Sequence, residues 1–591
     1  MIFPMLNGEN STRDFIEAFG GYNHNLRIND GEFYDMKNLT SSFYPLLAPR
    51  KPRGKLCETS GTPMALIEKD ALCHVTVEGD NLHFYMNGYD YDLGMTNIDK
   101  DVRRSLTSMG AYVIIMPDKK YINTANTEDK GNIESTYTSI EGENVTFDVC
   151  RADGTTYEVD LISATEPEGD IENGYVWLDT SVTPNSLKVY SKTNGMWSAV
   201  ATTFIKITAA GIGAKFEVYD GVQISGITVH QLEDLNNNMI IYAKEDDYIV
   251  VVGVVKDQYH FSQEEVITVE SWMPEMDFII ESNNRLWGCH YGLNRDGDMV
   301  NEIYASRQGK FKSWNMFLGT AEDSYYASVG TDGQFTGAIS YLGQPLFFKE
   351  NCMHLVQGSY PAQYRILDTA CRGVQKGSEN SLAMVNETLF YKSRTGVCAY
   401  NGALPTEISA NLGDIHYSKA VACGHKNKYY ISMLDSRSNE YEMFVFDTEK
   451  GLWHKEDNQH IIGFCSVNDE LYYIDGSNNI FTMFGSGTTD TSQIEWMAET
   501  GTMGCSAIDK KYISKLSLRL SMDVGTRVHI FIEYDSSGTW EAVSTLAGYN
   551  LRTFTVPIKP RRCDHLRLKI VGKGNAKIYS ISKTLEQGSD I

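Results

Sequence analysis

Short apolar runs, separated by turns rich in Gly, Asn and Asp, dominate the hydrophobic pattern of this chain. The i, i+3, i+4, i+7 spacing of an amphipathic helix is weak almost everywhere, whereas β-branched and aromatic residues gather in runs of strand length. The pattern therefore predicts an all-β protein.

One hydrophobic plan recurs: a polar or turn residue, two spacer positions, and then Leu or Tyr followed by aromatic residues. Five copies are anchored at Leu286, Leu346, Leu389, Tyr429 and Leu471. The anchors are 60, 43, 40 and 42 residues apart, and a spacing of about 40 residues is typical of a β-propeller blade. We expect the anchors on the inner strand of each blade. A β-sandwich array with accidental spacing is the alternative interpretation.

Two earlier stretches, 79–88 and 110–124, follow the same plan loosely and bring the number of candidate units to seven. We therefore predict a β-propeller of six to eight blades, with a blade shared between the two ends of the chain. The longer first interval leaves room for one extended loop, residues 315–335.

The repeat is lost twice, and each loss predicts a separate domain. Hairpin patterns with Asp-Gly and Asn-Gly turns predict a small β domain inserted in a blade loop. After residue 485, five strand-length runs have the spacing of a jelly-roll-like β-sandwich. The predicted division is an N-terminal extended strap at 1–54, first propeller blades at 55–125, an inserted β domain at 126–276, the remaining blades at 277–485 and a C-terminal β-sandwich at 486–591.

The net charge of −25, from 77 acidic and 52 basic side chains, argues against a protein that binds free nucleic acid, because such proteins carry a basic stripe. The eleven cysteines include no C-x-x-C pair, which argues against a zinc site and against a disulfide framework. No stretch has the apolar length of a membrane span, and the N-terminus lacks a secretory pattern. We therefore expect synthesis in the cytosol.

Propellers host many hydrolases, so paired carboxylates are the first catalytic candidates. The stretch SRQGKFKSW, residues 306–314, departs at three positions from the S-x-D-x-G-x-x-W turn of sialidase-type blades. The carboxylates that could still form a glycosidase pair are Glu32, Asp35, Glu281, Glu322 and Asp323. With 77 acidic residues such candidates arise by chance, and we predict that the chain is not an enzyme and has no catalytic residues.

Hard-cation ligands could come from the stretch LNRDGDMVNE, which contains Asn294, Asp296, Asp298 and Glu302. Met299 stands where the EF-hand order needs Gly, so we interpret the stretch as a polar hairpin tip and predict no metal site. The histidines lack spaced partners, and no nucleotide-binding or nucleophile-elbow motif is present. We predict no cofactor.

The N-terminal strap has a pattern of its own. Leu26, Ile28 and Phe33 are spaced to pin an extended chain against a surface. We expect that surface to be the chain's own propeller, with residues 1–18 reaching a neighbouring subunit. Short basic clusters occur at 49–54, 101–105 and 559–565, and we expect their arginines to pair with carboxylates across interfaces rather than with DNA phosphates.

Several segments, taken in order, carry a resemblance to a known group of proteins. They are G-G-Y-N-x-N-L-x-I-x-x-G-E-x-x-D-M-x-N-L from Gly20 onwards, YPLLAPRKPRG, PEMDFIIESNNRLWGC, ASRQGKFKSWNMF, FFKENCMHLVQGS and VPIKPRRCDHLRLKIVGKG. This order resembles the β-propeller tail proteins of tailed bacteriophages, among them the nozzle, hub and DNA-stabilisation proteins that close short tails. The likeness spans most of the chain outside the inserted domain.

The resemblance implies a structural protein of the virion tail, assembled in the host bacterial cytoplasm. It implies a homo-oligomeric ring of six copies that forms part of the DNA exit path and anchors other tail or adaptor proteins. Viral DNA would pass without specific binding, and an acidic lumen agrees because it repels a polyanion. The alternative is a receptor- or glycan-binding tail-tip protein that uses the inserted domain or the C-terminal sandwich. A depolymerase is the third and least favoured interpretation.

Overall fold

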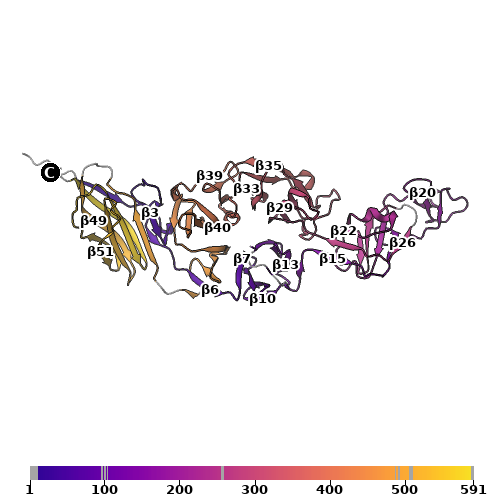
Figure 1. Cartoon of the computed structure of the whole chain (residues 1–591), viewed down its shortest axis with the longest axis horizontal. Helices are drawn as coiled ribbons and strands as arrows, with labels where there is room; N and C mark the ends of the chain where they lie inside the picture. The colour runs from indigo at the N-terminus through magenta and orange to yellow at the C-terminus, as the bar shows by residue number, and fades with distance from the viewer. Residues whose placement is uncertain are drawn as a thin grey trace, which may run out of the picture.

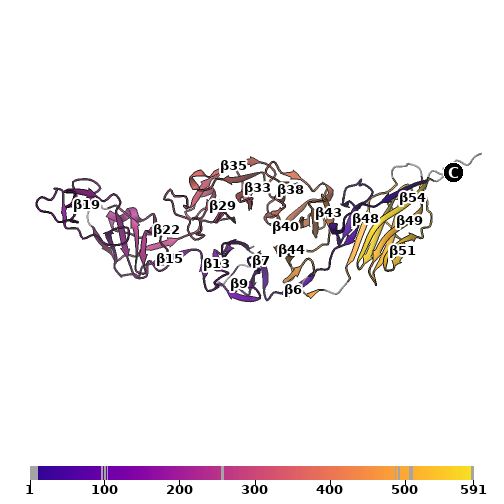
Figure 2. The ribbon, with the colours of Figure 1, turned by 180° about the vertical axis from the view of Figure 1, so that it is seen from behind.

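Three β-rich parts lie in a row along the longest axis of the molecule (Figure 1; Figure 2). The computed structural model describes residues 11–94, 98, 102, 104–254, 259–485, 488–489, 493–504 and 510–587. A β-sandwich lies at one end, a β-propeller in the middle and the inserted domain at the other end. Helical segments in these residues are short 3-10 turns, none of them long or apolar enough to span a bilayer. The predicted fold class, all-β with a propeller, an inserted β domain and a sandwich, is confirmed.

Within the described residues, seven antiparallel sheets of four or five strands surround one axis, inside the predicted range of six to eight blades. Each inner strand contacts the inner strands or the inner turn of the neighbouring blades, which completes the ring. The first three blades are β7 (Thr62–Glu68), β8 (Leu72–Glu78), β9 (Asn81–Met86) and β10 (Tyr89–Asp92); β11 (Ser105–Met109), β12 (Tyr112–Met116), β13 (Lys120–Asn123) and β14 (Lys130–Asn132); and β28 (Phe278–Ser282), β29 (Arg285–Leu293), β30 (Met299–Ala305) and β31 (Tyr325–Ser328). The next three blades are β32 (Phe335–Tyr341), β33 (Gln344–Lys349), β34 (Cys352–Gln357) and β35 (Arg365–Ala370); β36 (Ala383–Val385), β37 (Thr388–Lys392), β38 (Val397–Tyr400) and β39 (Thr406–Glu407); and β40 (Tyr417–His425), β41 (Lys428–Asp435), β42 (Tyr441–Asp447) and β43 (Leu452–Lys455).

The seventh blade joins distant parts of the chain. Its strands are β44 (Ile461–Val467), β45 (Glu470–Asp475), β46 (Asn479–Thr482), β6 (Gly54–Glu58) and β47 (Thr488–Thr489). Strand β6 runs antiparallel to β46, with Cys57 opposite Ile480 and Gly54 opposite Thr482. Residues 54–58 therefore belong to the last blade. The predicted boundary at 55, which placed residues 55–58 in the first blades, is wrong here. Closing the ring with an early strand satisfies the backbone groups of β46 that an open edge would leave unpaired.

The repeat anchors lie one strand further out than predicted. They occupy β29, β33, β37, β41 and β45, the second strand of each blade, and every one of them is fully buried. Four anchors are the second residue of their strand, but Leu346 is the third, because the preceding turn is Leu342–Gly343. Since side chains alternate across a strand, Leu346 packs with Leu389 of the following blade, whereas Leu286 packs against the preceding one.

The hairpin turns explain why a polar residue precedes each anchor. Asn283 and Asn284 connect β28 to β29 with φ values of 54° and 58°. Two successive positive φ values define the tight type I′ turn, and Asn adopts them more readily than most residues. The extended loop expected at 315–335 contains the short strand β31.

The inserted domain leaves the propeller after β14 and returns before β28. Its first sheet orders β15 (Ser135–Thr138), β27 (Thr268–Ser271), β22 (Gly221–Ser225) and β23 (Asn238–Ile240). The other two sheets order β24 (Ala243–Glu245), β25 (Tyr248–Val252), β21 (Phe204–Thr208), β16 (Val145–Cys150) and β26 (His260–Gln263), and then β17 (Leu161–Ser163), β18 (Val176–Asp179), β19 (Ser186–Ser191) and β20 (Met196–Ala199). A core of its own, including Phe147 and Ile207, makes it a domain rather than a long loop. Strand β14 still belongs to the second blade, so the predicted boundary at 126 is several residues early.

The C-terminal sandwich contains both ends of the described chain. One sheet orders β1 (Ser11–Ile16), β54 (Ala576–Gln587), β49 (Lys511–Met522) and β52 (Asn550–Val556). The other orders β2 (Gly21–Tyr22), β3 (Glu32–Lys37), β48 (Glu495–Thr500), β53 (Leu566–Lys573), β50 (Arg527–Tyr534) and β51 (Glu541–Ala547). The small pair β4 (Leu39–Thr40) and β5 (Ala48–Pro49) follows β3.

The strap was expected to lie against the chain's own propeller, and this expectation is wrong for β1. Strands β2 and β3 join a sandwich sheet but also contact the propeller strand β43, and the Tyr22 ring lies 5.4 Å from the ring of Phe444. Strand β1 pairs with β54, and β3 pairs with β48. Without the strap, β54 and β48 would be edges of their sheets, and pairing with β1 and β3 satisfies their backbone groups. Of the three predicted pinning residues, Phe33 is 1% exposed, but Leu26 is 96% exposed and packs against nothing.

Candidate functional site

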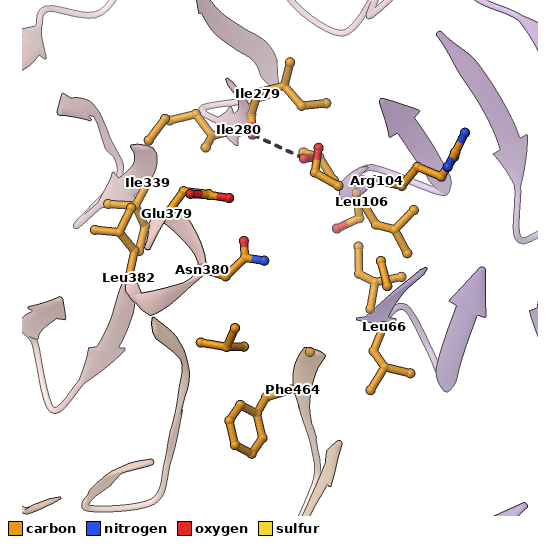
Figure 3. Close-up of a pocket in the computed structure, with 18 of the residues that line it drawn as sticks. Leu66, Arg104, Leu106, Ile279, Ile280, Ile339, Glu379, Asn380, Leu382 and Phe464 are labelled. Atoms are coloured by element: carbon orange, nitrogen blue, oxygen red, sulfur yellow. Dashed lines mark hydrogen bonds between the residues drawn. The ribbon is translucent and has the colours of Figure 1, made fainter. Parts of the chain in front are cut away.

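The propeller axis encloses a channel of about 530 Å³, lined by the inner strands and inner turns of all seven blades (Figure 3). Its wall combines polar surface with aliphatic side chains, among them Leu66, Leu106, Ile279 and Ile339 from four different blades. These side chains point inward because alternate residues of a β-strand face opposite sides, and the inner strand presents one side to the axis. The channel has the volume of a small-molecule site.

Few charged groups reach this channel. Arg104 is 3% exposed, and its Nε and Nη2 atoms donate to the two carboxylate oxygens of Asp118 at 2.9 and 3.2 Å. Such a two-point ion pair neutralises the guanidinium where it lies. The carboxylate of Glu281 accepts the backbone N–H of Asn284 at 2.8 Å. No histidine or cysteine belongs to the described residues that line the channel.

The structure does not bring the candidate carboxylates together. Glu32 lies in the sandwich, where it accepts hydrogen bonds from the Asn23 side chain and the Asn29 backbone at 3.0 and 2.8 Å. Asp35, in the same strand, lies 3.6 Å from the Lys455 ammonium. Glu281, by contrast, lines the propeller channel.

The remaining two candidates stabilise one loop of the third blade. Glu322 accepts a hydrogen bond from Arg307 at 3.1 Å. Asp323 accepts the Thr320 backbone N–H at 2.9 Å and the Thr320 hydroxyl at 2.7 Å. These carboxylates therefore have structural partners, and the five do not meet in one cleft.

The stretch considered for cation binding is the hairpin between β29 and β30. The Asn294 side-chain oxygen accepts the backbone N–H groups of Asp296 and Asp298 at 3.0 and 2.8 Å, which closes the turn. Glu302 lies further along β30 and accepts the Tyr304 hydroxyl at 2.6 Å. In the described part of the chain, no three His, Cys, Asp or Glu side chains are grouped as metal ligands.

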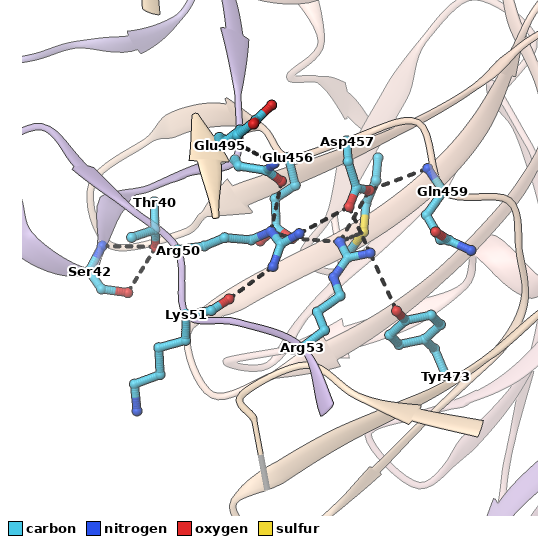
Figure 4. A network of polar contacts seen from close by, with 12 residues as sticks. Thr40, Ser42, Arg50, Lys51, Arg53, Glu456, Asp457, Gln459, Tyr473 and Glu495 are labelled. Carbon is cyan, nitrogen blue, oxygen red and sulfur yellow. Dashed lines mark hydrogen bonds and ion pairs between the residues drawn. The ribbon is translucent and has the colours of Figure 1, made fainter. Parts of the chain in front are cut away.

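The basic cluster at 49–54 fastens the strap to the propeller (Figure 4). Arg53 Nη2 lies 2.8 Å from Glu456 and Arg53 Nη1 lies 2.8 Å from Asp457, while Arg50 Nη2 lies 3.2 Å from Asp457. The side chain of Arg50 is 12% exposed and that of Arg53 is 8% exposed. Burial alone would lower the pKa of Arg53, but Asp457, Tyr473 and Glu456 outweigh burial and raise that pKa. The prediction that these arginines pair with carboxylates across an interface is confirmed.

A second cavity, of about 600 Å³, lies between the third blade and the base of the inserted domain. Its walls include Trp272, which enters from the inserted domain, and Asn315 and Phe317, which belong to the extended loop of the third blade. Sequence reasoning missed this site because its walls come from segments far apart in the chain. The long interval after Leu286 was the available signal, since it marked the loop that forms one wall.

Comparison with known proteins identifies no family: no family model and no curated protein matches the chain. Among solved structures, BamB from Moraxella catarrhalis matches at 8% identity and a TM-score of 0.30, over 72% of this chain and 97% of its own. The β-propeller domain of the trilobed protease from Pyrococcus furiosus matches at 10% identity and 0.24, over 53% and 94%. An exo-β-1,3-galactanase from Phanerochaete chrysosporium matches at 9% identity and 0.21, over 52% and 94%. Matches at this level carry no argument about function.

Proposed function

We propose that this protein is a structural component of a bacteriophage tail, a nozzle- or hub-like ring protein without catalytic activity. In this proposal several copies, six in the simplest arrangement, form a ring that is part of the DNA exit path and anchors other tail proteins. The order of segments from Gly20 to the C-terminal sandwich, which resembles such tail proteins, supports the assignment.

The observation that carries the proposal is the way in which one chain interlocks its own parts. Residues 11–58 supply strands to both sheets of the sandwich and to the last propeller blade. Between these strands, Arg50 and Arg53 form buried ion pairs with the propeller. Pulling sandwich and propeller apart therefore requires breaking strand pairs and exposing buried charges, which suits a part that transmits force.

A second strap contact holds the sandwich side. The Lys583 ammonium, in β54, lies 2.7 Å from Asp30 and 3.6 Å from Asp14, and its side chain is 4% exposed. Because the strap is anchored on both neighbours, it acts as a shared strut between two domains.

The route for DNA in this proposal lies between subunits. The channel inside one propeller, about 530 Å³, has room for a small molecule and not for a duplex. A net charge of −25 disfavours tight DNA binding and would let a polyanion slide past an acidic wall. We therefore place the DNA on the symmetry axis of the ring and not on the axis of the propeller.

Mass photometry of the purified full-length chain, followed by cryo-electron microscopy of phage particles that contain it, tests the proposal. We expect a closed ring in solution and propeller density around the tail axis. A strictly monomeric protein that is absent from particles would overturn the proposal. A ring with its own propeller channel on the tail axis would overturn only the placement of the DNA.

A further inference from the structure

The cavity between the third blade and the inserted domain has the features of a ligand site. Its volume, about 600 Å³, falls in the usual range for small-molecule sites. Its walls come from two domains, with Trp272 on the side of the inserted domain and Tyr304 and Phe317 on the side of the blade. Sites at domain junctions are common because neither domain fills the gap with its own core.

Aromatic rings line the cavity and continue onto its rim. Phe317 and Tyr326 are 49% and 58% exposed, and their rings meet edge to face with centroids 5.6 Å apart. The same two residues also line a smaller adjoining cavity of about 250 Å³. These two exposed, adjacent rings connect the two hollows, and each ring offers a face on which a flat apolar group can stack.

Two residues of the cavity wall carry a buried hydrogen-bond donor that has no acceptor among the described residues. Asn315 is 7% exposed, and its Nδ2 atom has no partner among the described residues; the same holds for the Trp272 Nε1 atom. An unsatisfied buried donor costs about 1–3 kcal/mol, so proteins rarely keep one without a use. Here two of them occur in the wall of one cavity.

The charges of the cavity wall favour hydroxyl groups over anions. Glu302 accepts hydrogen bonds from Tyr304 at 2.6 Å and from Ser328 at 3.2 Å. Burial and the neighbouring Glu302 raise the pKa of Tyr304, so the phenol keeps its proton. Arg295 is paired with Glu270, and its guanidinium lies 6.0 Å from the Trp272 ring. Because this cation is already paired, and because the carboxylates of Asp296 and Glu302 also line the cavity, the wall disfavours a phosphate, a sialic acid or a uronic acid.

We propose that this cavity binds a neutral sugar unit of an oligosaccharide. The apolar face of one sugar ring stacks on one of the two rings, Phe317 or Tyr326, and the next unit occupies the adjoining hollow beside the other ring. Sugar oxygens accept hydrogen bonds from Asn315 and Trp272, and sugar hydroxyls donate to the carboxylates of the wall. The inference rests on the cavity alone, so it stands or fails independently of the tail assignment.

The first test applies the full-length protein to an array of oligosaccharides. The neutral arm contains units of glucose, galactose, rhamnose and N-acetylglucosamine, and the anionic arm contains sialylated and uronate glycans. We expect binding in the neutral arm only. Absence of binding on the whole array, or binding restricted to the anionic arm, overturns the proposal.

Variants then locate the binding. The double change Phe317→Ala and Tyr326→Ala should raise the Kd of the best neutral oligosaccharide by about tenfold, measured by calorimetry. A matched control is Tyr89→Ala with Tyr549→Ala, since these rings are 70% and 67% exposed elsewhere on the molecule. The control should bind like the unmodified chain. Equal Kd values for the two double variants would overturn the assignment to this cavity.

Asn315→Leu separates binding from folding. Replacing an unsatisfied buried amide by an apolar side chain of similar size is neutral or stabilising in the free protein. We therefore expect an unchanged or higher Tm together with weaker sugar binding. A lower Tm with unchanged binding would mean that Asn315 is only a packing residue, which contradicts its proposed role.

Discussion

The propeller is attached to its two neighbours in opposite ways. Towards the sandwich, the strap adds strands to both domains, and Arg53 and Lys583 form buried ion pairs on either side. Towards the inserted domain, the covalent connection is a neck in which Ser135 lies opposite Ser271. An ion pair beside the neck, between Lys310 and Glu217, is exposed, with side chains 48% and 67% exposed.

The sandwich end is held by strands that the strap shares between two domains and by buried ion pairs. The inserted domain is held mainly by its covalent neck. Removing one partner of a buried ion pair costs about 3–5 kcal/mol, whereas an exposed pair contributes about 0–1 kcal/mol. The strapped end should therefore resist force and heat as one unit with the propeller. We expect the propeller to fold without the inserted domain.

The largest expected difference is between deleting the strap and deleting the inserted domain. Deletion of residues 1–53 removes three sandwich strands and the arginine contacts, a loss that exceeds the stability margin of about 5–15 kcal/mol, so we expect no soluble protein. Replacing residues 136–270 by Asn-Gly joins Ser135 to Ser271 through a tight turn and should leave a soluble, cooperatively melting protein. Soluble yield and circular dichroism measure both. A well-folded strap deletion, or an insoluble replacement, would reverse the comparison.

Arg53→Met is the strongest single change predicted at the strapped end. It leaves Glu456 and Asp457 partly buried without this cation, and we expect the free energy of unfolding to fall by about 3–5 kcal/mol. Urea denaturation measures the change. Arg394→Met, at an exposed turn position, serves as the control and should change the free energy by less than about 0.5 kcal/mol. Similar losses in the two variants would show that the buried ion pairs of Arg53 contribute no more to the free energy of unfolding than an exposed arginine does.

His454 makes the strapped end sensitive to acid. It lies in β43 beneath Gly21 of the strap, and burial, with a smaller contribution from Lys428, lowers its pKa to about 3. The folded state keeps this imidazole neutral and the unfolded state protonates it, so stability is full above about pH 6.5 and falls as the pH drops towards 3. The loss reaches about 1.4 kcal/mol per pH unit.

The variant His454→Gln tests this dependence. It should flatten the slope of unfolding free energy against pH between about 6 and 4. Since His260 is exposed in the inserted domain, His260→Gln is the matched control and should keep the original slope. An unaltered slope in His454→Gln would assign the acid sensitivity to other groups.

The smallest effect is expected beside the neck. Lys310→Ala removes the exposed pair with Glu217, so the free energy of unfolding should change by less than about 1 kcal/mol. Differential scanning calorimetry measures it, with a Glu217→Ala variant as the reciprocal test. A loss as large as that of Arg53→Met would mean that both ends are fixed alike.

Local patterns predicted the fold well because blades are local. The spacing of the Leu and Tyr anchors comes from hairpins closed within a few residues, so the sequence alone indicated a propeller. The register of Leu346 was missed because the turn Leu342–Gly343 gives no polar signal at its first position. One residue of slip moves a side chain to the other face of its blade.

Long-range pairing could not be predicted in the same way. The strap pairs with the distant strands β48 and β54. No local feature of residues 11–37 identifies these partners. The cavity was hidden for the same reason, because Trp272 and Asn315 meet only after the inserted domain has folded back. The candidate carboxylates illustrate the same limit, because Glu32 and Asp35 lie in the sandwich while Glu281 lines the propeller channel.

The closing strand of the seventh blade, β6, is synthesised long before the strand with which it pairs. Gly54 and Thr482 are 428 residues apart, yet the Thr482 hydroxyl donates to the Gly54 carbonyl. At a synthesis rate of about 5–20 residues per second, β6 leaves the ribosome on the order of half a minute before its partner exists. The nascent chain must keep this strand exposed and unpaired during that time. Its flanks, with Lys51, Pro52 and Arg53 before it, carry the charge and proline that discourage premature pairing with another chain.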